Sequence, residues 1–138
     1  MGIGDNESFK AASALAGGVA RQGETCGALI GALSALGLII GRDKIEDTTR
    51  YRAGMDTAGK ARRRFMDEMV TQFGLSAPLE NTLCRHIHMA IYGRSFDLTK
   101  NEDFQAFLKA GGHGDNGCPK VCAVAAEVAA QEIADLQR

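Results

Sequence analysis

Four cysteines are the residues of this chain whose type points most directly to chemistry. They are Cys26, Cys84, Cys118 and Cys122. A thiolate is a strong nucleophile and a soft metal ligand, so clustered cysteines serve thiol–disulfide exchange, metal binding or electron transfer. No secretory signal is visible in the first residues, and we expect a cytoplasmic protein. Because thiols there are mostly kept reduced, a redox, catalytic or metal-binding use is favoured over structural disulfides.

Two of the cysteines lie where helices are expected to begin. Cys26 follows Thr25, a residue suited to an N-cap, and opens an apolar run that extends to Gly41. Cys118 directly precedes Pro119, and proline is common in the first turn of a helix. Unpaired backbone N–H groups and the positive end of the helix dipole stabilise a thiolate. The sequence therefore predicts lowered pKa values for Cys26 and Cys118.

The pairing of the four sulfurs stays open at this stage. Cys118 and Cys122 are one helical turn apart, where Cβ atoms are about 5–6 Å from each other. A disulfide needs about 3.5–4.5 Å, so a bond between them would distort the first turn. Cys26 and Cys84 are the alternative partners. The competing interpretation is that the cysteines are small buried packing residues, most of all Cys122, which falls on the apolar face of its helix.

A metal site is the second chemical interpretation. Cys84 and His88 are four residues apart, as are Cys118 and Cys122, so two pairs of ligands could meet around zinc or an iron–sulfur cluster. The spacing is not the C-x₂-C of most structural zinc sites. Two other histidines have no partner suggested by spacing and are expected in solvent: His86 and His113.

Length and composition narrow the class of protein. The 138 residues fit one domain, and the net charge of −1 argues against binding to nucleic acid. A basic cluster at residues 60–64 is followed by Asp67 and Glu68, which should pair with it along a solvated helix face. The apolar run from Gly27 to Gly41 is too short and too rich in glycine for a membrane span.

The hydrophobic spacing is helical throughout and predicts an all-α fold. We expect a compact bundle of five to six helices in a single domain, residues 1–138, around a buried central helix rich in glycine and alanine. The small face of that helix should let a neighbouring backbone approach closely. The expected helices are an N-terminal one capped by Asn6 or Ser8 and ending at Gly17-Gly18, then Thr25 to Gly41, Asp43 to Gly74, Ser76 to Gly93, Asn101 to Ala110, and Pro119 to about Leu136.

The segment from Gly23 to Leu38, which contains Cys26-Gly27-Ala28-Leu29-Ile30-Gly31, resembles the core motif of the redox-active family C_GCAxxG_C_C. The similarity extends to Gly17-Gly18 with Arg21 upstream, and to Phe73-Gly74, Cys84-Arg85, Gly93 and Cys118-Pro119-Lys120-Val121 downstream. It spans the chain from about Phe9 to Ile133.

The resemblance implies a small protein, often encoded near transporter genes, whose recurrent cysteines are redox-active or hold an iron–sulfur cluster. It carries over to Cys26, Cys84 and Cys118 as the redox or ligand set. Family members often have a further Asn-Cys pair upstream, which is not among these 138 residues. Cys122 either stands in for that sulfur or is unrelated to it.

Three hypotheses follow. The first is a thiol redox protein in which Cys26 and Cys118 exchange disulfides with Cys84 or Cys122, together with a redox partner not identified by the sequence. The second is an iron–sulfur or zinc protein that uses the same cysteines and His88. The third is a helical interaction module whose cysteines only pack, with transporter-associated partners. Assembly with further copies of the chain is left open by the sequence.

Overall fold

The computed structural model describes residues 2–138. Its helices confirm the all-α prediction: α1 (Asn6–Ala11), the 3₁₀ turn η1 (Ser13–Leu15), α2 (Gly27–Ile40), α3 (Thr48–Phe73), α4 (Cys84–Tyr92), α5 (Asn101–Lys109) and α6 (Cys118–Leu136). Within residues 2–138 the only β pairing is one isolated antiparallel bridge, between Thr25 and Leu83. No helix in this part of the chain is both long and apolar enough to cross a membrane.

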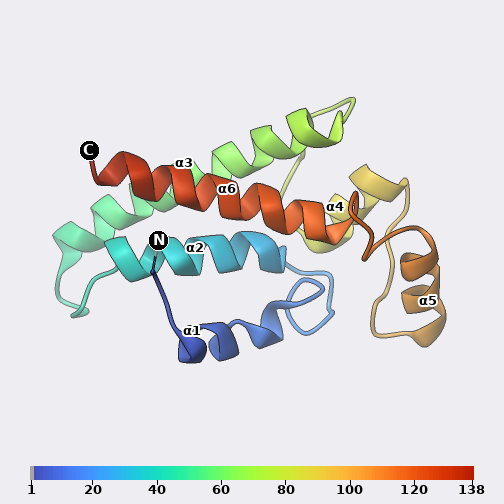
Figure 1. Ribbon diagram of the computed structural model, residues 1–138, viewed down its shortest axis with the longest axis horizontal. Coiled ribbons are helices and arrows are strands. Elements are labelled where there is room, and N and C mark those ends of the chain that lie inside the picture. The colour runs from blue at the N-terminus through green and yellow to red at the C-terminus, as the bar shows by residue number, and fades with distance from the viewer. Residues whose placement is uncertain (1) are drawn as a thin grey trace.

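Three long helices, α2, α3 and α6, pack side by side and form the body of the molecule (Figure 1). The main core lies where they meet and buries Leu29 of α2, Phe65 and Met69 of α3, and Val124 of α6. The short helices α4 and α5 lie at the end of the body where α2 and α6 begin. Helix α1 lies below α2 in the view, whereas α6 lies above it (Figure 1). Apolar residues at three- and four-residue spacing turn one face of each long helix inward.

The central helix α2 buries only its leucine face. Leu29 and Leu36 are almost fully buried, whereas Ala28, Gly31 and Ala32 on the small face are half-buried. A Cβ atom added at Gly31 would meet no atom within 4 Å. The expectation that another backbone packs closely against this face holds at Gly27, where an added Cβ would clash with the Leu15 carbonyl oxygen, but not at Gly31, where the space is open.

The boundaries of α1 and α3 differ from those predicted. Asp5 caps α1 by accepting a hydrogen bond from the Ser8 backbone N–H, and the helix gives way to a 3₁₀ turn before Gly17. Helix α3 begins at Thr48, not at Asp43, because Asp47 is the residue whose side chain accepts the capping hydrogen bond. Its end at Gly74, in the left-handed conformation, is as expected.

The fourth helix begins at Cys84, eight residues later than predicted from Ser76. The preceding residues are used in backbone hydrogen bonds to the chain before α2. The Cys26 N–H donates to the Thr82 carbonyl (2.9 Å), and the Cys84 N–H donates to the Glu24 carbonyl (2.7 Å). These long-range bonds replace the local ones of a helix and tie the first residue of α4 to the N-cap of α2.

Residues 17–21 form a left-handed turn that sequence patterns do not reveal. All five φ angles are positive: Gly17 +66°, Gly18 +74°, Val19 +57°, Ala20 +49° and Arg21 +66°. Non-glycine residues rarely take this conformation, and each one costs about 1–2 kcal/mol. The turn packs against α4, since a Cβ at Gly18 would lie 2.5 Å from the Cys84 Cβ. The strained turn is thus packed closely against Cys84, the first residue of α4.

A buried carboxylate joins α3 to α6. Glu132 is 2% exposed and pairs with Lys60 (2.9 Å) and Arg64 (3.3 Å). The basic cluster on α3 is therefore balanced in part by a different helix. The predicted pairing of Arg64 with Glu68 along the surface of α3 is wrong, because Arg64 turns toward the buried Glu132 instead.

Candidate functional site

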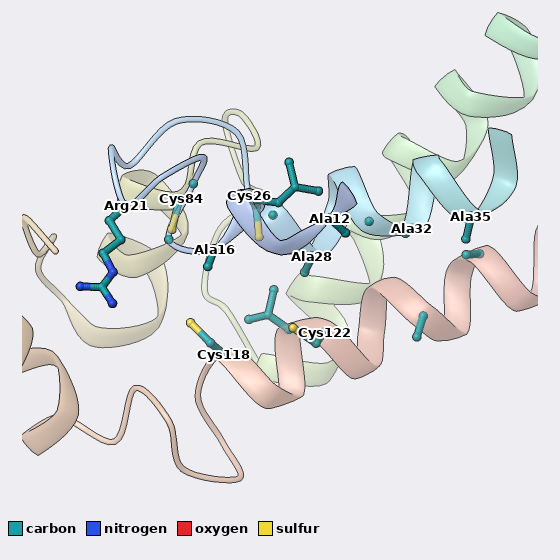
Figure 2. Close-up of a pocket in the computed structure, with 18 of the residues that line it drawn as sticks. Ala12, Ala16, Arg21, Cys26, Ala28, Ala32, Ala35, Cys84, Cys118 and Cys122 are labelled. Carbon is teal, nitrogen blue, oxygen red and sulfur yellow. The ribbon is translucent and has the colours of Figure 1, made fainter. Parts of the chain in front are cut away.

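A cleft of about 820 Å³ runs along the small face of α2. It lies between the N-terminal segment, α2 and α6, and residues of α4 and α5 line one end. Figure 2 shows the four cysteines gathered at one end, with alanines of α2 continuing away from them. Clefts of about 300–1,000 Å³ are typical of small-molecule sites.

All four cysteines line this cleft, although the fold brings them from three separate helices. Cys26 is the N-cap of α2, Cys84 is the first residue of α4, and Cys118 is the first residue of α6. The predicted helix starts at Cys26 and Cys118 are confirmed, and Cys84 proves to be a third. Cys122 lies one turn into α6. All four thiols are free, with no pair at disulfide distance.

Burial controls the acidity of these thiols. It raises the pKa of Cys84 to about 12 and that of Cys118 to about 11, and it also raises the pKa of Cys26. Hydrogen bonds from the backbone at Leu29 and Ala28 act in the opposite direction on the Cys26 pKa, but burial outweighs them. The prediction of lowered pKa values at Cys26 and Cys118 is therefore wrong. A helix start favours a thiolate only where the sulfur stays solvated.

Cys122 is the most exposed of the four, contrary to its expected place as a packing residue on an apolar face. The inward face of α6 is carried by Val121, Val124, Ala125 and Val128, and Cys122 points instead toward the cleft. Burial still raises the Cys122 pKa, and its thiol in turn raises the pKa values of Cys26 and Cys118. Cys122 is thus the thiol most accessible to solvent.

The i,i+4 pair of Cys84 and His88 is a real contact. The Cys84 Sγ lies 3.6 Å from the His88 Nε2, and both residues are buried. The His88 ring stacks on Phe107, with ring centroids 5.1 Å apart. Burial lowers the His88 pKa, so the imidazole is neutral near pH 7. Its Nδ1 has no hydrogen-bond partner among residues 2–138.

Arg21, which lines the cleft, and Tyr92, which lies beside Cys118, were not singled out as functional from the residues. Tyr92, one turn beyond His88, has its pKa raised to about 12 by burial and then by the nearby Cys118 thiol. Its hydroxyl, like the His88 Nδ1, has no hydrogen-bond partner in the described chain. The four-residue spacing between His88 and Tyr92 is the sequence signal that could have indicated Tyr92. Arg21 is placed by the left-handed turn, over the ring of Phe104 at 5.2 Å, and no spacing pattern indicates it.

The other histidines are exposed, as predicted. The His86 ring lies 2.7 Å from the Asn81 amide, and His113 packs its ring against Phe104 and Phe107 at the end of the cleft. For a metal site, no three His, Cys, Asp or Glu residues in the described chain form a group that could hold one ion. The two predicted ligand pairs therefore do not fit a single zinc ion in this arrangement.

No curated protein and no solved structure matches the chain. The family model described as "Putative redox-active protein (C_GCAxxG_C_C)" matches residues 1–132, almost the whole sequence. The chain therefore belongs to the C_GCAxxG_C_C family.

Proposed function

We propose that this chain is a cytoplasmic thiol redox protein in which Cys26 and Cys118 form a reversible disulfide. The observation that carries the proposal is the gathering of all four cysteines on one cleft. Two thiols are oxidised together when they give up two electrons and two protons and form one S–S bond. The two-electron oxidant is reduced in the same step, and a dithiol reductant reverses it.

The choice of Cys26 and Cys118 rests on their position within the group. The Cys26 thiol has an electrostatic interaction with each of the three other cysteines, and so does the Cys118 thiol. Cys84 and Cys122 have no such interaction with each other. Cys118 follows a glycine-rich loop, residues 111–117, and its N–H donates to the Gly112 carbonyl (2.9 Å), so this first turn of α6 must move to bring the sulfur to bonding distance. Cys26 is held by its bond to Thr82 and stays in place.

Disulfide mapping after mild oxidation tests this function. The reduced protein is treated with diamide, an azo oxidant that takes two hydrogens from a pair of thiols, and peptides are analysed by mass. We expect a Cys26–Cys118 link that dithiothreitol removes. Cys26→Ser and Cys118→Ser should each abolish the link, while Cys122→Ser should retain it. Four free thiols after oxidation of the folded wild-type protein would refute the proposal.

A second candidate function is electron transfer through an iron–sulfur cluster held by the four cysteines. It is favoured by a Cys₄ donor set around one cleft in which no pair is at disulfide distance. A cluster with several irons spreads its ligands more widely than the single ion excluded above. Anaerobic purification followed by iron, sulfide and zinc analysis and an absorption spectrum separates the two candidates. A colourless sample free of iron and zinc eliminates the second.

A further inference from the structure

The cleft continues well beyond the cysteines, and the thiol chemistry alone does not account for its extension. Alanine and glycine residues form its walls along two helices. On α2 these are Ala28, Gly31, Ala32 and Ala35, and on α6 they are Ala126, Ala129 and Ala130. None of the residues among 2–138 that line it is acidic. An elongated apolar ligand fits such walls, because each small side chain leaves room for ligand atoms.

Arg21 is the only lysine or arginine among the described residues that line the cleft. Figure 2 places it at the same end as the four sulfurs. The left-handed turn fixes its backbone there, and the Phe104 ring supports its guanidinium. A planar polar group bound at this end would find a hydrogen-bond donor in Arg21.

His88 is a second indication that the cleft binds a polar group, because its Nδ1 has no hydrogen-bond partner among the described residues. It lines the cleft, is 2% exposed, and is neutral because burial lowers its pKa. The Cys84 thiol stays protonated, so we assign its S–H as the donor to His88 Nε2, which places the ring hydrogen on Nδ1. A buried N–H donor without an acceptor costs about 1–3 kcal/mol. A buried donor left without an acceptor calls for an explanation, and a polar ligand group in the cleft would supply one.

We propose that the cleft binds a quinone, with its ring at the cysteine end beside Arg21 and its apolar tail along the small-residue walls, and that this quinone oxidises the Cys26–Cys118 dithiol. The inference rests on the thiol redox function proposed above and names its oxidant.

The properties of the cleft favour a quinone over a charged disulfide. Glutathione disulfide carries several carboxylates, and one arginine in an apolar cleft would leave most of them unpaired. A quinone is uncharged, and its carbonyl oxygens accept hydrogen bonds from a guanidinium. It also takes up two protons with its two electrons, which suits thiols that remain protonated near pH 7.

The reaction balances with two thiols and one quinone. The Cys118 sulfur adds to a ring carbon, and its proton passes to a carbonyl oxygen. The Cys26 sulfur then attacks the Cys118 sulfur, so that the S–S bond forms as the C–S bond breaks. The released electron pair and the second proton leave with the hydroquinone. Arg21 stabilises the negative charge that develops on the ring oxygen.

The test uses the fully reduced 138-residue protein and decylubiquinone under anaerobic conditions. Every ring position of this quinone is substituted, so a thiol cannot be trapped on it by loss of a ring hydrogen. Quinone absorbance and the number of free thiols are followed together. We expect one quinone to be consumed for every two thiols lost, with formation of the Cys26–Cys118 link.

Two matched variants locate the reaction. Gly31 lines the cleft and Gly37 does not, yet both lie in α2 with no atom near an added Cβ. Gly31→Phe should fill the cleft and lower the rate of quinone reduction at least tenfold, whereas Gly37→Phe should leave it unchanged. Both replace a helical glycine, so both should keep or raise the melting temperature, which shows that each variant folds.

The outcomes separate this inference from the function on which it rests. If diamide produces the disulfide but the quinone is not consumed, the quinone proposal is overturned and the redox function stands. If neither oxidant forms a disulfide, both are overturned. Quinone reduction by Gly31→Phe at the wild-type rate would also overturn the proposal, since the cleft could not then be the binding site.

Discussion

At the scale of single residues, the Cys118 thiol illustrates two opposing effects. It belongs to the first residue of α6, where the helix dipole favours an anion, and yet its pKa is raised to about 11. Burial is the largest cause, and the neighbouring thiols of Cys26 and Cys122 add to it. The same order of causes holds for Cys84. These cysteines are therefore neutral thiols near pH 7.

Alkylation kinetics test this state of the thiols. Because the Cys118 pKa is about 11, only about one thiol in ten thousand is ionised at pH 7. The rate of Cys118 carbamidomethylation by iodoacetamide should rise about tenfold per pH unit from about pH 8 to pH 10. A free cysteine peptide, measured alongside, should level off near its ordinary pKa. A Cys118 rate that levels off below about pH 8 would show a thiolate-stabilising site instead.

The same shifts predict how stability depends on pH. The raised pKa of Cys84 means that the folded state holds the thiol proton more tightly than the unfolded state does. This contribution is complete below about pH 9 and is lost as the pH rises toward 12. Urea unfolding of wild type and Cys84→Ala should therefore show a stability difference that shrinks above pH 9. An unchanged difference up to pH 11 would contradict the assignment.

At the scale of elements, the left-handed turn at residues 17–21 contains two kinds of residue. Its glycines adopt positive φ angles without strain, whereas its other residues are strained by them. Gly18→Ala combines a positive φ with a clash against Cys84 and should lower the free energy of unfolding by at least about 2 kcal/mol. Ala20→Gly relieves the strain at φ +49° and should raise it by about 1 kcal/mol. Denaturant titration measures both changes.

A helical alanine provides the control for the second substitution. Ala123 is an exposed residue of α6, and Ala123→Gly should lower stability by about 1 kcal/mol, the usual direction for this change. If Ala20→Gly destabilises the protein as Ala123→Gly does, the turn is not left-handed in solution.

The elements that could be predicted from the sequence are those decided by local patterns. The spacing of apolar residues in α2, α5 and α6 indicates helices, and Gly74 and Gly93 mark two ends correctly. The start of α4 was missed because Thr82 and Cys84 make backbone hydrogen bonds to Cys26 and Glu24, which are far away in the chain. The turn at residues 17–21 was missed because Val19 and Ala20 carry no preference for positive φ.

The candidate site could be predicted in its residue types but not in its surroundings. The four cysteines and the Cys84–His88 contact follow from residue identity and spacing. The cleft does not follow, because a stripe of glycine and alanine is equally compatible with a closely packed neighbour and with open space. The thiol pKa values depend on that difference in burial, and so their direction was predicted wrongly.

At the scale of the whole molecule, the three-helix body contains α2 and α6, the two helices that form the small-residue walls of the cleft. Glu132 of α6 pairs with Lys60 and Arg64 of α3, and a buried carboxylate contributes most when its partners remain in place. Glu132→Ala should lower the free energy of unfolding by about 2 kcal/mol, less than for a fully buried pair because both cations reach solvent.

Glu127 is the matched control for this substitution. It lies on the exposed side of α6 and accepts one hydrogen bond from Gln72. Glu127→Ala should change stability by no more than about 0.5 kcal/mol in the same urea titration. Equal effects of the two substitutions would mean that the Glu132 network does not join α3 to α6.

The central claim, that the cysteines on this cleft form a reversible redox pair, is tested most directly by an equilibrium titration. The protein is equilibrated at a series of ratios of reduced to oxidised dithiothreitol, and its free thiols are then labelled and counted by mass. We predict a single two-electron transition, from four free thiols to two, that is absent from Cys26→Ser. Four free thiols at every ratio would contradict the account.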